Sequence, residues 1–441
     1  MVQPKGFLAR LGIDRREARA WAWYDWANSA FYTVVVTAVF PQFLAKVLAV
    51  ELPEGEAARL YALTNAISLA FVALGALLLG AVADANGWRR RLLSLFACLG
   101  ILATAGLFFL GPGDIVPGLV LYAIANFGVA MSVVFYDALL PHVARSGEED
   151  QLSSTGFAFG YVGGGLLLAA AVGLALGAPH FGLTPVAEDP SMLALRIGFL
   201  FVAVWWALFS LPVLLLVPEP PSVAGTMGFR DAIQQVRSVW GELRQYPQAL
   251  MMLIAFLLYS DGINTIIRMS SIYAEELGIP LESTLMVFLA IQFVGVPATL
   301  LLAKLATRIG AKRVVMGGVV AFVGITAFGF QLSSELDFWM LGLSVGCVMG
   351  GVQALSRSLF ARMIPRQKSG EFFGLFALGE KVGGALGPGL FFLAADVFDS
   401  SRMAILVIAV FFLAGGFLLS KVDVAVGERH ATEAEARIPT D

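Results

Sequence analysis

Twelve apolar runs, each long enough to cross a lipid bilayer as a helix, divide this sequence of 441 residues. Inside lipid a backbone must satisfy its own hydrogen bonds, so such runs fold as helices. The composition agrees, because 14% of the residues are charged, against about 25% in a soluble domain. The expected spans are 21–49, 57–83, 91–111, 117–139, 151–178, 193–217, 247–277, 281–306, 312–331, 337–361, 371–395 and 402–421.

Positive charge is unevenly distributed over the loops between these runs. Of the 29 lysine and arginine residues, only Lys46, Arg59, Arg196 and Arg402 fall on one side of the membrane. Three lie within helices, and the others fall on the opposite side. Loops rich in lysine and arginine stay in the cytoplasm. We therefore predict a multi-pass membrane protein with both termini cytoplasmic, in the cell inner membrane if the source is bacterial.

The longest connection, between the sixth and seventh runs, predicts the domain organisation. Its apolar residues recur at helical spacing, which is typical of an amphipathic helix, either on the membrane surface or packed under the bundle. The polar tail is expected to be disordered. The expected parts are an N-terminal cytoplasmic segment at 1–20, a six-helix bundle at 21–218, a cytoplasmic linker at 219–246, a second six-helix bundle at 247–421 and a polar cytoplasmic tail at 422–441.

The two halves of the sequence repeat each other weakly. A polar stripe at i, i+3 and i+4, positions that share one helix face, occurs as Asp25, Asn28 and Ser29 and again as Asp261, Asn264 and Thr265. Three further pairs follow in the same order: the loops 80–91 and 303–313, Asp137 and Arg357, and the small-residue runs 156–164 and 379–387. Internal symmetry of this kind is typical of transporters. It predicts an all-α membrane protein whose twelve transmembrane helices form two pseudo-symmetric six-helix bundles.

The motif Gly80-x-x-x-Asp84-x-x-Gly87-x-Arg89-Arg90-Arg91 follows the second run. On a six-plus-six arrangement with a long central loop, it resembles the major facilitator superfamily. The stretches YDWANSAF and GGVQALSRSLFARMIP, followed by EFFGLFALGEKVGGALGPGLFF, are similar to the vacuole-effluxer-like branch. The resemblance spans residues 20–420. It implies the major facilitator fold, alternating access by rocking of two bundles, and export of small metabolites, with amino acids from a vacuole as the eukaryotic precedent.

Polar side chains inside the apolar runs are the candidates for a substrate and proton pathway, because a charge at the bilayer centre costs about 2.5–3.5 kcal/mol. Asp25 and Asp261 are the proton-coupling candidates, and a structural cap or an interhelical hydrogen bond is the alternative for each. Arg268 suits a substrate carboxylate, or else an internal ion pair with Asp261 or Glu380. The full set is Asp25, Asn28, Tyr32, Asp261, Asn264, Arg268, Gln292, Gln353, Glu380 and Lys381.

A second set of residues predicts a cytoplasmic gate. The resemblance implies that Asp84 caps the start of the eleventh helix near Ser369 and holds this gate shut. Asp137 and Arg357 carry opposite charges at related positions, so we expect a partly hydrated ion pair between the bundles. The alternative is that Asp137 pairs within its own bundle, with Arg89, Arg90 or Arg145. The gate candidates are Gly80, Asp84, Gly87, Arg89, Arg90, Asp137 and Arg357.

Motifs typical of enzymes are not found in the sequence. The three histidines are scattered, and there is neither a phosphate-binding loop nor a metal-ligand spacing. We expect no enzymatic activity, no cofactor, no metal and no nucleic-acid partner. The expected partners are a small-molecule substrate, the lipid bilayer and protons, and the expected unit is a monomer. Cys98 and Cys347 fall inside apolar runs and are expected to be reduced core residues.

These observations together predict a secondary active transporter. It would move a small polar metabolite, an amino acid or related carboxylate, in the direction of efflux, by rocker-switch alternating access coupled to protons. A uniporter of another small solute, and a sensor or scramblase on the same fold that transports nothing, are the alternatives.

Overall fold

The computed structural model describes residues 6–53, 56–184, 192–222, 241, 243–379, 390, 393 and 401–437. Within these residues every regular element is helical, and ten helices are long and apolar enough to cross a membrane, or up to eleven if the bent pair α15 and α16 forms one span. Residues 371–379 begin the expected eleventh span, and most of the remainder of 371–395 lies outside the described residues. The prediction of an all-α membrane fold is confirmed.

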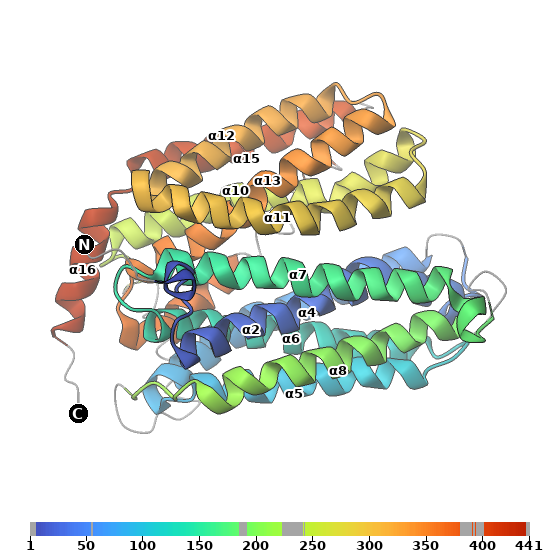
Figure 1. Cartoon of the computed structure of the whole chain (residues 1–441), viewed down its shortest axis with the longest axis horizontal. Helices are drawn as coiled ribbons and strands as arrows, with labels where there is room; N and C mark the ends of the chain where they lie inside the picture. Colours follow the sequence, from blue (N-terminus) through green and yellow to red (C-terminus); the bar gives the residue numbers. More distant parts are fainter. Residues whose placement is uncertain are drawn as a thin grey trace.

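The first bundle is built from six membrane-length segments, preceded by the short α1 (Phe7–Arg10). Figure 1 shows these segments packed side by side, with α7 nearest to the second bundle. The first segment is α2 (Arg16–Ala30), a π-helix (Phe31–Val39), α3 (Phe40–Phe43) and a second π-helix (Leu44–Leu48). The others are α4 (Glu56–Asn86), α5 (Arg89–Gly106), α6 (Ile115–Val143), α7 (Glu149–Leu176) and α8 (Leu193–Leu216).

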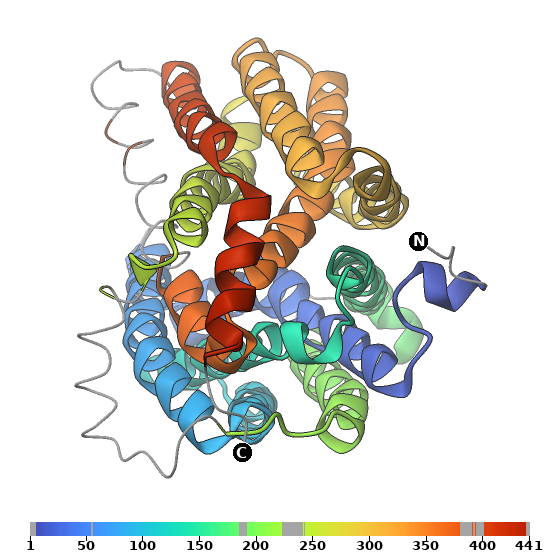
Figure 2. The ribbon, with the colours of Figure 1, turned by 90° about the vertical axis from the view of Figure 1, so that its left-hand side faces the viewer.

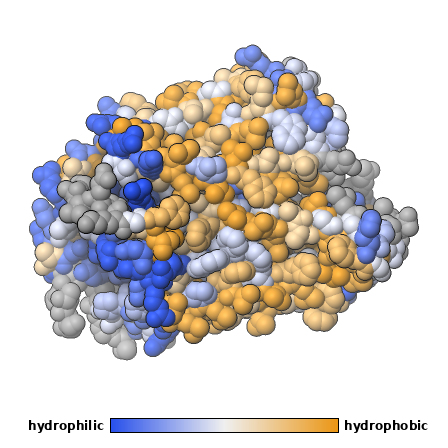
Figure 3. All heavy atoms as spheres, viewed as in Figure 1, coloured by the Kyte–Doolittle hydropathy of each residue, from blue (hydrophilic) through white to orange (hydrophobic). Residues whose placement is uncertain are grey.

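The second bundle lies against α7, as the upper layer of Figure 1. Its described helices are α10 (Pro247–Glu276), α11 (Leu281–Ile309), α12 (Ala311–Phe330), α13 (Glu335–Arg362) and α15 (Ser401–Lys421), followed by α16 (Val424–Glu435). We call the end at which α2 and α7 begin and α6 and α13 end the terminal end, because α1 and α16 also lie there (Figure 1). Polar residues gather at this end, and apolar residues cover the length of the bundles (Figure 3).

A proline leaves one carbonyl of the π-helical stretch without a helical donor. Pro41 has no backbone N–H, so a carbonyl upstream of it is left without its helical donor. In the i to i+5 pattern of a π-helix that carbonyl belongs to Val36, and the Tyr61 hydroxyl of α4 donates to Val36 O at 2.8 Å. The broken pattern therefore ties the first segment to the second.

The tail after residue 421 is not disordered as expected. Asp423 caps α16 by accepting a hydrogen bond from Val426 N at 3.1 Å. Glu435, at the other end of α16, accepts a bond from Arg366 N at 2.8 Å. Figure 2 shows α16 crossing the terminal end from the second bundle toward the first. The prediction failed because a polar composition was read as disorder, whereas the capped helix has specific partners.

Two other expectations concern residues outside the bundles' core. The amphipathic helix expected in the linker falls on residues of which 223–240 and 242 lie outside the described part.

Cys98 and Cys347 are free thiols, but both are exposed rather than buried in the core. A helix that is apolar all round does not reveal from its sequence which face meets lipid, so the prediction of burial was wrong.

Candidate functional site

Arg357, near the end of α13, reaches from the second bundle into the first. Its Nη1 donates to Asp137 Oδ1 at 2.8 Å, and its Nη2 lies 3.3 Å from Asp25 Oδ2. The guanidinium also donates from Nε to Ser153 Oγ at 2.9 Å and from Nη2 to Ser153 O at 3.0 Å. The ion pair expected between Asp137 and Arg357 is therefore present, and a second carboxylate shares it.

This cluster is buried, contrary to the expectation of a partly hydrated pair. The side chains of Arg357 and Asp137 are 5% and 12% exposed, because aromatic rings surround the guanidinium. Its carbon lies 5.0 Å from the ring centre of Trp21, 5.5 Å from that of Tyr136 and 4.5 Å from that of Phe157. Removing one partner of a buried ion pair costs about 3–5 kcal/mol, several times the cost at a hydrated surface.

The three arginines of the alternative pairing each lie against a carboxylate other than Asp137. Arg89 pairs with Asp84 at 2.6 Å. Arg145 lies 3.3 Å from Asp14. Arg90 lies 3.9 Å from Glu219. Each of the three arginines considered thus has another carboxylate.

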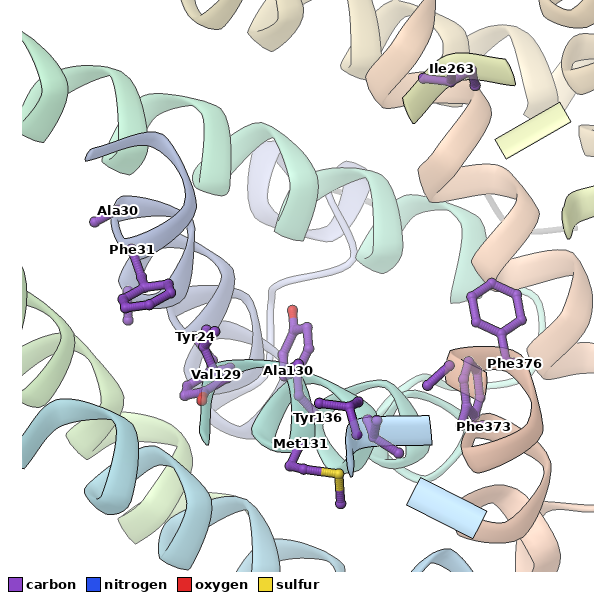
Figure 4. Close-up of a cluster of buried hydrophobic side chains, with 14 of the residues drawn as sticks. Tyr24, Ala30, Phe31, Val129, Ala130, Met131, Tyr136, Ile263, Phe373 and Phe376 are labelled. Atoms are coloured by element: carbon purple, nitrogen blue, oxygen red, sulfur yellow. The ribbon is translucent and has the colours of Figure 1, made fainter. Parts of the chain in front are cut away.

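Asp25 is held in place from two further sides. The Tyr136 hydroxyl donates to Asp25 Oδ2 at 2.8 Å, and Figure 4 shows this hydroxyl directed away from α6. Trp21 stacks on the Tyr136 ring with their centres 4.2 Å apart. On α7, a Cβ added to Gly156 would lie 2.5 Å from Asp25 Oδ2. A glycine at 156 therefore provides the space that the carboxylate occupies.

Asp84, at the end of α4, caps the helical residues that follow 369. Its Oδ1 accepts from Gly370 N and its Oδ2 from Glu371 N, both at 2.8 Å. A carboxylate that accepts N–H bonds at the start of a helix also gains from the helix dipole. The structure thus has the hydrogen bonds of the cap that the resemblance implies. These bonds join the two bundles at the terminal end.

The close approach of the chains around this cap depends on glycine. The ideal Cβ position at Gly80 overlaps the carbonyl of Gly370, and that at Gly374 overlaps the carbonyl of Ala76. Ser369 Oγ donates to Ala138 O at 2.8 Å and lies 3.2 Å from His142 Nε2. Side chains larger than hydrogen at 80 or 374 would keep the bundles apart.

Two of the gate candidates lie at the turn between α4 and α5, against the residues that follow α8. Arg90 Nη1 donates to Val217 O at 3.0 Å, and the N–H groups of Arg90 and Arg91 donate to Glu219. Burial raises the pKa of the Glu219 carboxyl, against the opposing effect of these two donors. Gly87 has a φ of +64° and approaches Pro220 O. Arg90 and Gly87 thus hold the turn between α4 and α5 against the end of α8.

The pathway candidates other than Asp25 have different surroundings. Asp261 is 2% exposed on α10. Asn28 donates to Tyr24 O within its own helix at 2.7 Å, and Gln292 of α11 packs against Gly165 of α7. Tyr32, Asn264 and Gln353 are half-buried. The side chain of Arg268, and Glu380 and Lys381 altogether, lie outside the described residues.

Sequence reasoning missed one face of α7 that completes the site. Ser153 and Phe157 contact Arg357, and Asp150 Oδ1 accepts a hydrogen bond from Ser358 Oγ at 2.5 Å. The spacing of 150, 153 and 157 is i, i+3 and i+7, which places all three on one side of a helix. That spacing, continued by the glycines of the same helix, was the available signal.

Comparison with known proteins decides the family. Residues 54–432 match the family model described as vacuole effluxer Atg22 like. This chain belongs to that family. The Atg22-like chain is 30% identical over 415 residues to the uncharacterized MFS-type transporter YxiO of Bacillus subtilis, covering 92% of this chain and 95% of that protein. It is 26% identical to autophagy-related protein 22 of Kluyveromyces lactis, covering 78% and 75% of the two chains.

Solved structures agree on the fold of the Atg22-like chain. The proton:xylose symporter XylE matches with a TM-score of 0.73 at 14% identity, over 95% of this chain and 98% of that one. A bacterial homologue of the iron transporter ferroportin, in its outward-facing state, matches with a TM-score of 0.62 at 14% identity, over 92% and 99%. The chain is therefore a transporter of the major facilitator superfamily, and not an enzyme.

Proposed function

We propose that this Atg22-like chain is a secondary active transporter that exports a small polar metabolite, an amino acid or related carboxylate, by rocker-switch alternating access. The observation that carries the proposal is the interlock at the terminal end. There Arg357 of the second bundle meets Asp137 of the first, and Asp84 caps backbone N–H groups of the second bundle. These contacts are made between side chains and backbone groups of different bundles, so they can break while the helices within each bundle stay packed.

Direction and orientation follow from the charge pattern and the family. Lysine and arginine gather in the loops of the terminal end, and this charge pattern supports a cytoplasmic position for it. The described state, with the terminal end closed, is then outward-facing, as the ferroportin homologue is by its description. The family description as vacuole effluxer supports export.

The coupling ion in this proposal is the proton, carried by Asp261 with Asp25 as the alternate. Asp261 is 2% exposed on α10, and the Asp25 side chain is 13% exposed beside Arg357. A buried carboxylate gains a proton readily when its cation leaves. Two structural neighbours are named as proton symporters, for xylose and for fucose. Arg268 is the proposed partner of a substrate carboxylate.

Counterflow in proteoliposomes tests the proposal. Vesicles loaded with one unlabelled solute at a time, drawn from amino acids, other carboxylates and sugars, are given the same labelled solute outside. We expect trans-stimulated uptake for amino acids or related carboxylates. If no solute of these classes exchanges while the reconstituted protein remains folded, the substrate class is wrong.

A cross-link at the terminal end provides the matched control. Ser358 and Asp150 lie in hydrogen-bond contact across the bundles, so cysteines at both positions can be joined by oxidation or a short bis-thiol reagent. We expect the cross-link to stop counterflow and reduction to restore it, whereas each single cysteine variant should respond to neither. Counterflow that continues through a complete cross-link would contradict alternating access at this end.

A further inference from the structure

The surroundings of the Arg357 guanidinium form a site that belongs wholly to the other bundle. We call it the guanidinium cage: Trp21, Asp25, Tyr136, Asp137, Ser153 and Phe157. These residues come from α2, α6 and α7 of the first bundle, whereas Arg357 enters from α13 of the second. The first bundle thus holds a cation site whose occupant is tethered to its neighbour.

The chemistry of the cage is that of an organic-cation site. Two carboxylates lie at 2.8 and 3.3 Å from guanidinium nitrogens, and three ring faces lie within 5.5 Å of its carbon. Carboxylates pair with the N–H donors of a guanidinium, and ring faces attract its weakly hydrated plane. A metal ion would instead prefer a shell of oxygen or nitrogen ligands, and ring faces supply none.

The carboxylates of the cage lose a positive neighbour when Arg357 leaves. Asp25 and Asp137 bring two carboxylates, and Arg357 brings one positive charge. The cluster is buried, with side chains 5%, 12% and 13% exposed for Arg357, Asp137 and Asp25. When the bundles part, Arg357 leaves with α13 and both carboxylates keep their aromatic surroundings. A cation from solution can then take the place that Arg357 leaves, in competition with protonation of the carboxylates.

We propose that, in the state that is open at the terminal end, the guanidinium cage binds a cationic side-chain group of the transported solute, a guanidinium or a primary ammonium remote from its α-carbon. The proposal rests on the alternating access proposed above. Arg357 and the solute's cation compete for one site, so a bound solute keeps this end open. Closure requires that the solute move on and that Arg357 return to the cage.

A variant that vacates the cage tests the binding chemistry without any transport. Methylguanidinium is titrated into purified Arg357→Ala protein, and the melting temperature of the protein is recorded. Methylurea has the same shape and no charge, so it is the control. Methylammonium tests whether an ammonium group binds as well. We expect saturable stabilisation by the cations and at least tenfold weaker binding of methylurea. The response should vanish in Arg357→Ala combined with Asp25→Asn and Asp137→Asn. Equal responses to methylguanidinium and methylurea would overturn the proposal.

The unmodified protein provides a second test that does not depend on the folding of a variant. Arginine and citrulline have the same length and shape, but the side chain of citrulline is uncharged. We expect counterflow of labelled arginine to exceed that of citrulline at least tenfold, and equal rates would overturn the cage as a cation site. If neutral solutes exchange while cations do not, the cage fails and the transport function stands. If nothing exchanges, the transport function fails, and the titration of Arg357→Ala still decides about the cage.

Discussion

Replacing Gly80 by alanine should open the terminal end. A Cβ at position 80 would overlap Gly370 O and would lie 2.9 Å from Gly370 C and 3.1 Å from Glu371 Cα. All three atoms belong to the second bundle, so the clash exists only while the two bundles are together. The first bundle itself gains no bad contact among these neighbours, and the variant therefore acts on the closed state.

The size of the effect follows from the distances. Ordinary contacts of a Cβ begin at 3.4 Å. Because the nearest atom, Gly370 O, lies well inside that distance, the two backbones must separate by about 1 Å. The bonds from Gly370 N and Glu371 N to Asp84, now 2.8 Å long, would lengthen to about 3.8 Å, which is beyond hydrogen-bond distance. Overpacking of a tight contact costs about 1–3 kcal/mol. That cost shifts the equilibrium toward the open state by roughly 5- to 150-fold.

Thiol labelling measures this shift. Cys98 and Cys347 are exposed, so both are first replaced by serine. Ser358 is buried between the bundles, and a cysteine is then introduced there by Ser358→Cys. The initial rate at which this cysteine reacts with a maleimide reports opening of the terminal end. We expect Gly80→Ala to raise that rate by the stated factor. Gly75→Ala on the same helix is the matched control, because the nearest neighbours of its Cβ would be Met131 at 3.4 Å and Phe127 at 3.7 Å, both of its own bundle and at ordinary contact distance. A rate unchanged by Gly80→Ala, or raised equally by Gly75→Ala, would refute the reasoning.

Three further predictions concern other parts of the chain. Asp261→Asn should retain exchange but lose accumulation driven by a pH gradient, and if accumulation persists in both Asp261→Asn and Asp25→Asn, the proton is carried elsewhere. Asp137→Arg and Arg357→Asp should each raise the labelling rate at position 358, because each leaves like charges in a buried cluster. The double variant should bring the rate back toward that of the parent. If the double variant labels as fast as the faster single variant, the ion pair does not hold the bundles together. Truncation after Val422 removes the contact of Glu435 with Arg366 and should lower the melting temperature in calorimetry, whereas an unchanged value would mean that α16 adds no stability.

The sequence was sufficient for the fold because each apolar run has one solution in lipid, a helix, and because the loop motif marks the superfamily. It also predicted which residues pair across the terminal end. The offset between Asp137 and Arg357, and the loop motif around Asp84, each named partners that the structure places 2.8 Å apart. One signal is an offset between the two halves of the sequence and the other is a short loop motif, and both can be recognised from the sequence without the helix packing.

Features that depend on helix rotation and on packing between distant segments could not be predicted in this way. Asp25 joins Arg357 only because Gly156 lets α7 approach α2 closely. The ion pair is buried because the rings of Trp21 and Phe157 cover it. Both residues stand among apolar residues in the sequence, so nothing in the sequence marks them as neighbours of a charged group. The order of the tail depends on a cap at Asp423 and on partners in a loop far upstream.

The two halves of the chain differ in sequence where they meet. Asp137 and Arg357 occupy related positions on α6 and α13, and related helices of a two-fold arrangement approach each other at its axis. Had both copies kept the same charge, two like charges would lie together in a buried site, at a cost of several kcal/mol. The two copies of the loop motif also differ. Asp84 caps a helix of the other bundle, whereas its counterpart Thr307 donates its hydroxyl to Lys304 O of its own helix. Opposite or unequal residues at such positions turn a repeat into an interface that can open.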